Sequence, residues 1–170
     1  MEVEHTEQPC SHLSSDKNFT KSVQGKSVYK DQCARCFCDP KHKGGILLCL
    51  TCFNSFCQAD HLQEHLAKRS AHCLYLRIEM FEKPVATEGH EITKVAIGKE
   101  GGAIGGPEYD TKYTLYCASC KVSHVDKSTL NNKALEGIVA SLIDCDSAYK
   151  KQALVSWELE VHPCEHTLTL

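Results

Sequence analysis

Twelve side chains that can ligate a metal recur along this chain at the short spacings that zinc sites use. Cysteine is unusually frequent, with 12 residues among 170, and 10 histidines accompany it. Three C-x-x-C pairs are present, and a C-x-x-C turn allows two thiolates to face one ion. In chain order the candidate ligands are Cys10, His12, Cys33, Cys36, Cys49, Cys52, Cys57, His61, His65, His72, Cys117 and Cys120. These twelve groups suffice for three tetrahedral zinc ions.

Zinc explains the cysteines better than disulfide bonds do. The first residues, MEVEHTEQPC, are acidic and have no apolar core, so we do not interpret them as a signal peptide. Cysteines in C-x-x-C pairs with histidines downstream are typical of zinc sites in a reducing compartment. We therefore expect a cytoplasmic or nuclear location. Cys38, Cys73 and Cys145 do not fit the ligand spacing and are interpreted as small core residues.

Charge and hydropathy exclude two classes of partner. The net charge is -3, from 19 basic and 22 acidic residues, and the basic residues form no stripe. A nucleic-acid-binding protein needs a clustered excess of lysine and arginine to neutralise phosphates. The apolar runs are also too short to span a bilayer. We expect neither nucleic acid nor a membrane as a partner.

Spacing alone does not decide which ligands share an ion. The simplest local arrangement joins two neighbouring C-x-x-C pairs and leaves one cysteine and three histidines for a second ion. Its two sets would be Cys33, Cys36, Cys49 and Cys52, and Cys57, His61, His65 and His72. An interleaved arrangement would divide the same residues differently, and both remain open at this point.

Short strands are expected to position these ligands. In CLYLRIE, Leu74, Leu76 and Ile78 alternate with other residues, which predicts a half-buried strand. ITKVAI (92–97) and YTLYC (113–117) are predicted as further strands. Five glycines in GKEGGAIGGPE lie within residues 98–106, and this segment (98–108) is therefore predicted to be a loop.

Two helices are predicted in the C-terminal third. NNKALEGIVASLIDC places four apolar residues on one helical face, Leu135, Ile138, Val139 and Leu142. Asp146 is expected to cap a second helix, in which Tyr149, Ala153 and Trp157 repeat every four residues and are interpreted as core. The chain is thus expected to divide into a polar tail, a zinc-binding region, a helical extension and a terminal segment, at 1–9, 10–124, 125–161 and 162–170.

The order of the ligands resembles the three-zinc form of the UBP-type zinc finger, a ubiquitin-binding module of deubiquitinases. VYKDQCARCF, AIGKEGG and SLIDCDSAYKKQALVSWELEV resemble the N-terminal variant UBP region of the isopeptidase T-like ubiquitin-specific proteases, which take apart free polyubiquitin. The resemblance implies an α+β fold, a small twisted sheet with helices and three zinc ions, followed by a helical extension. It also implies the ligand sets Cys10, His12, Cys117 and Cys120; Cys33, Cys36, Cys57 and His61; and Cys49, Cys52, His65 and His72.

The same resemblance implies a role without catalysis. The catalytic Cys box of these proteases, G-N-(S/T)-C, does not occur in this chain. We expect a structural and docking module that contacts the catalytic domain of its own protein and meets ubiquitin or polyubiquitin through that protein. Cys164-x-His166 would begin a second UBP finger within 162–170.

Four positions predict that capture of the ubiquitin C-terminal tail is lost. Finger domains of this type that bind the tail use an arginine and aromatic side chains, which suit a carboxylate and a slim glycine tail. Here Ala59 stands in place of the arginine, and Leu47 and Ala118 stand in place of aromatics. Only Tyr116 keeps an aromatic ring.

Two other interpretations compete with this one. HLQEH (61–65) fits the H-x-x-E-H motif of some zinc proteases, but a catalytic zinc needs an open coordination position. The block from Cys33 to His72 would also suit a treble-clef or B-box-like interaction finger of a ubiquitin-ligase type protein. That alternative leaves the outer ligands, Cys10-x-His12 and Cys117-x-x-Cys120, unexplained.

Overall fold

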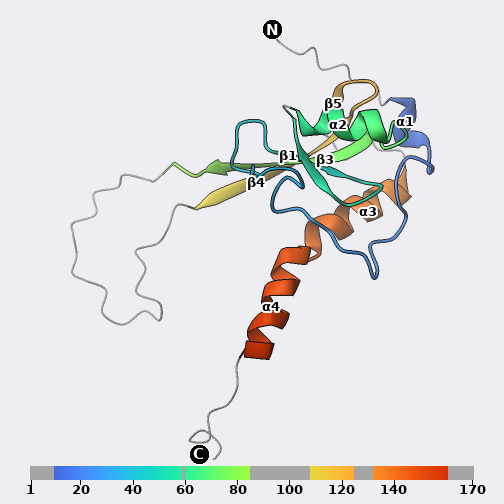
Figure 1. Ribbon diagram of the computed structural model, residues 1–170. Helices are drawn as coiled ribbons and strands as arrows, with labels where there is room; N and C mark the ends of the chain where they lie inside the picture. Colours follow the sequence, from blue (N-terminus) through green and yellow to red (C-terminus); the bar gives the residue numbers. More distant parts are fainter. Residues whose placement is uncertain (1–9, 59, 85–107, 125–131, 161–170) are drawn as a thin grey trace, which may run out of the picture.

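The computed structural model describes residues 10–58, 60–84, 108–124 and 132–160, and for 157–160 it describes the backbone alone (Figure 1). A five-stranded antiparallel sheet has the strand order β2-β1-β3-β4-β5. The strands are β1 (Ile46–Cys49), β2 (Ser55–Cys57), β3 (Leu74–Glu82), β4 (Tyr109–Cys117) and β5 (Val122–His124). The helices are α1 (Ser11–Ser14), α2 (His61–Lys68), α3 (Lys133–Asp144) and α4 (Ala148–Glu160). A small sheet with helices is the α+β fold that was expected.

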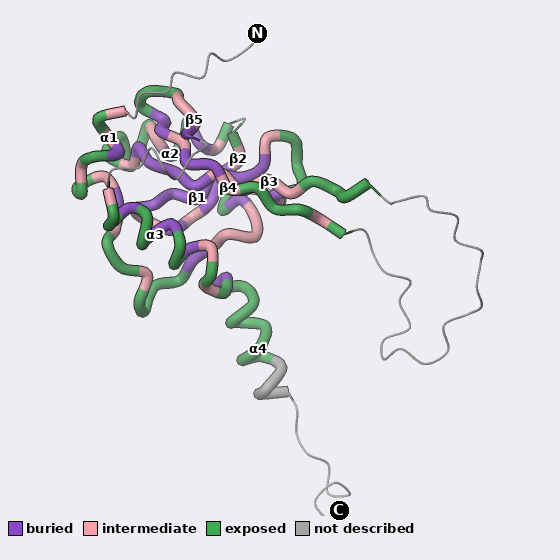
Figure 2. The backbone as a smooth tube through the Cα atoms, turned by 180° about the vertical axis from the view of Figure 1, so that it is seen from behind, coloured by how far each residue is buried: buried purple, intermediate pink, exposed green. Residues whose placement is uncertain are grey.

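The centre of the sheet is buried on both faces. Alternation along β1 places Ile46 and Leu48 in the main core and Leu47 in a second apolar cluster on the opposite face. Leu62 of α2 belongs to that second cluster, together with Phe56 of β2. Figure 2 shows the buried backbone concentrated in the sheet and in the parts of the helices that pack on it.

The strand predicted from CLYLRIE is present as β3, but it is not half-buried. Leu74, Leu76 and Ile78 face the main core as expected, whereas Tyr75 on the other face is 0% exposed. The prediction was wrong for Tyr75 because the second cluster covers that face at the start of the strand. YTLYC is confirmed as a strand and lies in β4, which pairs with β3 from Leu74↔Cys117 to Glu82↔Tyr109.

Helix α3 forms as predicted and completes the main core. Leu135, Ile138, Val139 and Leu142 are buried in the same cluster as residues of β1 and β3. The Asn132 side chain caps the helix by accepting hydrogen bonds from two backbone N–H groups at its start. The apolar face of α3 therefore gains its stability from contact with the sheet.

Helix α4 differs from the prediction in two ways. Its first turn is capped by Ser147, whose hydroxyl accepts from the Lys150 N–H at 3.3 Å, and so the prediction of Asp146 as the cap was wrong. The helix projects away from the sheet (Figure 1), and Tyr149 and Ala153 are exposed. Their interpretation as core was wrong, and the side chain of Trp157 lies outside the described residues.

Several predictions fall where the structure does not describe the chain. These are the tails 1–9 and 162–170, the strand 92–97 and the glycine-rich loop up to residue 107. The division of the chain into four parts thus stays a prediction. Among the described residues, no helix is long and apolar enough to cross a membrane.

Candidate metal centres

The twelve predicted ligands lie in three groups of four. In each group, one ligand atom from every residue lies within 4.8 Å of the other three. The first group is Cys10, His12, Cys117 and Cys120, the second is Cys33, Cys36, Cys57 and His61, and the third is Cys49, Cys52, His65 and His72. Donor atoms bound to one tetrahedral zinc would be about 3.3–3.8 Å apart, from Zn–S and Zn–N bonds of about 2.3 and 2.0 Å. The sets coincide with those that the resemblance implies.

The first group joins the segment at residues 10–12 to the end of β4 and the turn that follows it. His12 lies on the short helix α1 and Cys117 ends β4, while His12 Nδ1 and Cys120 Sγ are 3.3 Å apart. Burial raises the pKa of Cys10, and the hydrogen bond with Cys73 raises that of Cys117. A thiolate at these positions needs a cation beside it, which fits a metal site.

The second group is built from the turn at Cys33 and the junction between β2 and α2. His61 Nδ1 lies 3.1 Å from Cys57 Sγ and 3.5 Å from Cys33 Sγ. The Cys33 N–H donates to the Cys38 carbonyl at 2.8 Å, which closes the turn around the C-x-x-C pair. Three sulfurs and one imidazole nitrogen form a Cys₃His donor set, a common structural zinc site.

The third group lies against the second apolar cluster. Cys49 ends β1 and His65 lies on α2, while His65 Nε2 and His72 Nδ1 are 3.2 Å apart. The His65 ring stacks on Phe56 with centroids 4.2 Å apart, which fixes the direction of its nitrogen. Phe53 adopts a φ of 58° directly after the C-x-x-C pair, and this turns the chain from β1 into β2. The donor set is Cys₂His₂.

The cysteines outside the ligand sets differ in their surroundings. Cys73 is buried in the main core, as predicted. Cys145 is partly buried and packs against that core. Cys38 is partly buried and closes the turn of the second group, and it belongs to neither apolar cluster.

The H-x-x-E-H motif does not gather its histidines at one centre. His61 and His65 both lie on α2, but His61 belongs to the second group and His65 to the third. Cysteines supply the other donors at both centres, apart from His72. The geometry therefore does not match a protease zinc that both histidines hold.

Two of the positions at which we expect the tail pocket to be altered are buried. Leu47 is 0% exposed and Ala118 is 8% exposed, and both belong to the second apolar cluster with Tyr116 packed against it. Ala59 lies outside the described residues.

The sequence analysis missed Arg77 at the edge of this cluster. Arg77 is the cross-strand partner of Leu47, and its guanidinium carbon lies 5.1 Å from the centroid of the Tyr116 ring. Its Nη2 donates to the Gln58 Oε1 at 3.2 Å. A guanidinium is thus present beside the retained aromatic ring, although it comes from β3. Only the register between β1 and β3 could have indicated it, and spacing along the chain does not supply that register.

Comparison with known proteins identifies a family model and several proteins that are similar to this chain. Residues 20–84 match the family model of the variant UBP zinc finger. The chain is 28% identical over 165 residues to ubiquitin carboxyl-terminal hydrolase 14 of Schizosaccharomyces pombe, covering 95% of this chain and 20% of that protein. It is 27% identical to ubiquitin carboxyl-terminal hydrolase 13 of Gallus gallus, covering 86% and 18% of the two chains. It is 25% identical to the human ubiquitin carboxyl-terminal hydrolase 5, covering 81% and 18%.

The chain thus spans about a fifth of the length of these relatives. The family match covers the second and third groups, and the similarity to the hydrolases extends over most of the chain. Residues 20–84 of this chain match the variant UBP zinc finger, and most of the chain is similar to the ubiquitin carboxyl-terminal hydrolases named above.

Proposed function

We propose that this chain is a non-catalytic module of a ubiquitin-specific cysteine protease and that three zinc ions hold it together. The observation that carries the proposal is the gathering of twelve Cys and His ligands into three tight groups. Each ion would be bound by the four residues of one group and would act as a structural clasp, since protein donors fill all four positions. The twelve ligands would fill all four coordination positions of each ion, so no position would be open for a substrate or an activated water.

The parent protein would act on ubiquitin chains in the cytoplasm or nucleus. Relatives that carry a similar region are named ubiquitin carboxyl-terminal hydrolases, and this supports a parent that hydrolyses bonds to ubiquitin. Free polyubiquitin as its substrate is our proposal. The chain itself has no G-N-(S/T)-C box, so we assign catalysis to another part of the parent. The module would then dock on the catalytic domain.

We propose that the module does not bind the C-terminal tail of ubiquitin. The burial of Leu47 and Ala118 supports this, because a tail could enter only by displacing packed apolar side chains. Arg77 is a guanidinium at the edge of that cluster that could still bind a carboxylate. A direct binding measurement must therefore include a variant in which Arg77 is replaced.

The experiment is a calorimetric titration of the zinc-loaded chain with ubiquitin and, in parallel, with ubiquitin that lacks its last two glycines. We expect weak or no binding to both, with no difference between them. Tight binding to intact ubiquitin alone would overturn the loss of tail capture. In that case Arg77→Ala would show whether Arg77 holds the carboxylate, with Arg69→Ala, an exposed arginine at the end of α2, as the matched control.

A further inference from the structure

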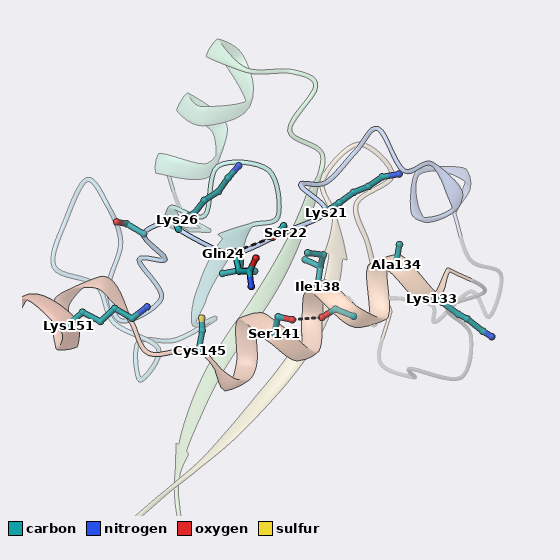
Figure 3. A pocket seen from close by; sticks show the side chains of 14 residues that line it. Lys21, Ser22, Gln24, Lys26, Lys133, Ala134, Ile138, Ser141, Cys145 and Lys151 are labelled. Atoms are coloured by element: carbon teal, nitrogen blue, oxygen red, sulfur yellow. Dashed lines mark hydrogen bonds between the residues drawn. The ribbon is translucent and has the colours of Figure 1, made fainter.

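A groove of about 780 Å³ lies between residues 21–27 and helix α3 (Figure 3). It is separate from the three metal centres, since none of their ligands lines it. Residues from the start of α4 close one end, where Lys151 points toward the groove. The volume is within the range of sites that bind small ligands or a few residues of a peptide.

The lining of this groove is positively charged, although the chain as a whole is not. Four lysines line it, Lys21, Lys26, Lys133 and Lys151, and no aspartate or glutamate does. The whole chain has a net charge of -3, so the groove differs in sign from the protein around it. Such a local concentration of one charge attracts a ligand of the opposite sign.

Two of these four lysines already have a partner in the structure, and two do not among the residues that it describes. Lys21 forms an ion pair with Asp16 at 2.8 Å, and the Lys26 amine lies 5.8 Å from the centroid of the Phe53 ring. Lys133 and Lys151 form no ion pair with any residue that the structure describes. Figure 3 shows the lysines spread around the rim, with Lys151 pointing toward the groove and Lys133 pointing away from it, so the long Lys133 side chain would change rotamer to meet a ligand.

The rest of the lining is suited to a polypeptide. Val23 is partly exposed and offers apolar surface, whereas Ile138 belongs to the buried main core, and Ser22, Gln24 and Ser27 offer hydrogen-bonding groups beside Val23. Apolar surface between cations suits an acidic peptide that also carries an apolar side chain. Nucleic acid is disfavoured, because no aromatic side chain lines the groove on which a base could stack.

We propose that this groove binds an extended acidic segment of a partner polypeptide, with carboxylates on the rim lysines and one apolar side chain on Val23. The affinity should fall with added salt, since the rim lysines are exposed to solvent and salt screens such charges. This binding does not depend on zinc chemistry or on ubiquitin, so it can fail without affecting the function proposed above.

The test is a fluorescence anisotropy titration of the zinc-loaded chain with a labelled short peptide of glutamates around a central leucine. The groove variant Lys133→Glu with Lys151→Glu should bind at least about tenfold more weakly, because two rim attractions become repulsions. The control variant, Lys68→Glu with Lys112→Glu, makes the same charge change at exposed lysines outside the groove and should lose less than about threefold. Circular dichroism and zinc content must be unchanged in both variants.

Two further probes separate the alternatives. A peptide with serine for the central leucine should bind more weakly, and a single-stranded DNA of matched charge should bind more weakly than the glutamate peptide. The proposal would be overturned by no binding of the peptide at about millimolar concentration. Equal losses in the two variants, no effect of the leucine, or tighter binding of the DNA would overturn it as well.

Discussion

The backbone conformation of Gly45 determines how the chain enters strand β1. It precedes β1 with a φ of 62°, in the left-handed region that side chains disfavour, and a Cβ there would collide with the carbonyl oxygen of Ile78 on β3. We expect Gly45→Ala to lower the free energy of unfolding by more than about 2 kcal/mol, because backbone strain and a backbone clash add. Urea denaturation with zinc in excess measures it.

Gly25 provides the matched control for that substitution. Its φ of 70° is similar, but nothing lies within 4 Å of an added Cβ. Gly25→Ala should therefore cost only about 1 kcal/mol, from the backbone conformation alone. Equal losses in the two variants would show that the contact with Ile78 contributes nothing.

Cys117 and Cys73 are neighbouring thiols with different expected roles, since the first is a metal ligand and the second is a core residue. Cys117 belongs to the first group, whereas Cys73 is buried beside it and the two side chains form a hydrogen bond. We expect Cys117→Ala to lower the zinc content from three ions per chain to two, and Cys73→Ala to leave it at three. Zinc analysis by mass spectrometry of the purified variants tests this. A loss of zinc in Cys73→Ala would mean that the first group uses a different ligand set.

At the scale of elements, the corner between α3 and α4 is fastened to residues 28–31. The Lys30 amine donates to the carbonyls of Leu142 and Ile143 at the end of α3, at 3.0 and 2.8 Å. The Ser147 hydroxyl donates to the Asp31 carboxylate and also caps α4. These polar contacts anchor the base of a helix whose described side chains beyond Ser147 are otherwise largely exposed.

Loss of the Ser147 hydroxyl should loosen this corner. Ser147 is 0% exposed, and we expect Ser147→Ala to cost about 2 kcal/mol from the lost cap and the lost hydrogen bond to a carboxylate. Ser141→Ala is the control, because its exposed hydroxyl bonds only to the Gly137 carbonyl within α3, and its cost should stay below about 0.5 kcal/mol. Hydrogen exchange of the α4 amides should rise in Ser147→Ala alone. Unchanged exchange would contradict the anchoring role.

The sequence predicted elements where a local pattern sufficed and failed where burial depends on distant neighbours. The apolar period of α3 was strong enough to identify its buried face. The four-residue repeat of Tyr149 and Ala153 looked similar, but α4 projects away from the sheet; Tyr149 meets the Tyr29 ring edge-on with centroids 5.5 Å apart, and both Tyr149 and Ala153 remain exposed. The prediction for Tyr75 failed in the opposite direction. Alternation predicts that its face of β3 is exposed to solvent, but residues of α2 and β2 cover that face.

At the scale of the whole molecule, residue types and spacing predicted which side chains gather but not how they divide. Both the local and the interleaved arrangement satisfy the C-x-x-C geometry. The assignment of ligands to groups follows from the antiparallel strand order β2-β1-β3-β4-β5. This order brings Cys117, at the end of β4, close to Cys10 and His12, and it places α2 between the second and third groups. Arg77 was missed for the same reason, since its position beside Leu47 is a property of the sheet register.

Removal of zinc is expected to unfold the finger as a unit. The third group includes Cys49 of the second apolar cluster and the first includes Cys117 of the main core, so each core depends on a metal centre. A structural zinc site contributes on the order of 10–16 kcal/mol of apparent binding energy at neutral pH, comparable to the roughly 5–15 kcal/mol of net stability of a whole domain. A strong chelator should therefore abolish the near-UV circular dichroism in one transition, and added zinc but not magnesium should restore it, since thiolates and imidazoles prefer zinc. A chain that kept this signal after complete zinc removal would show that the apolar cores are stable without the metal.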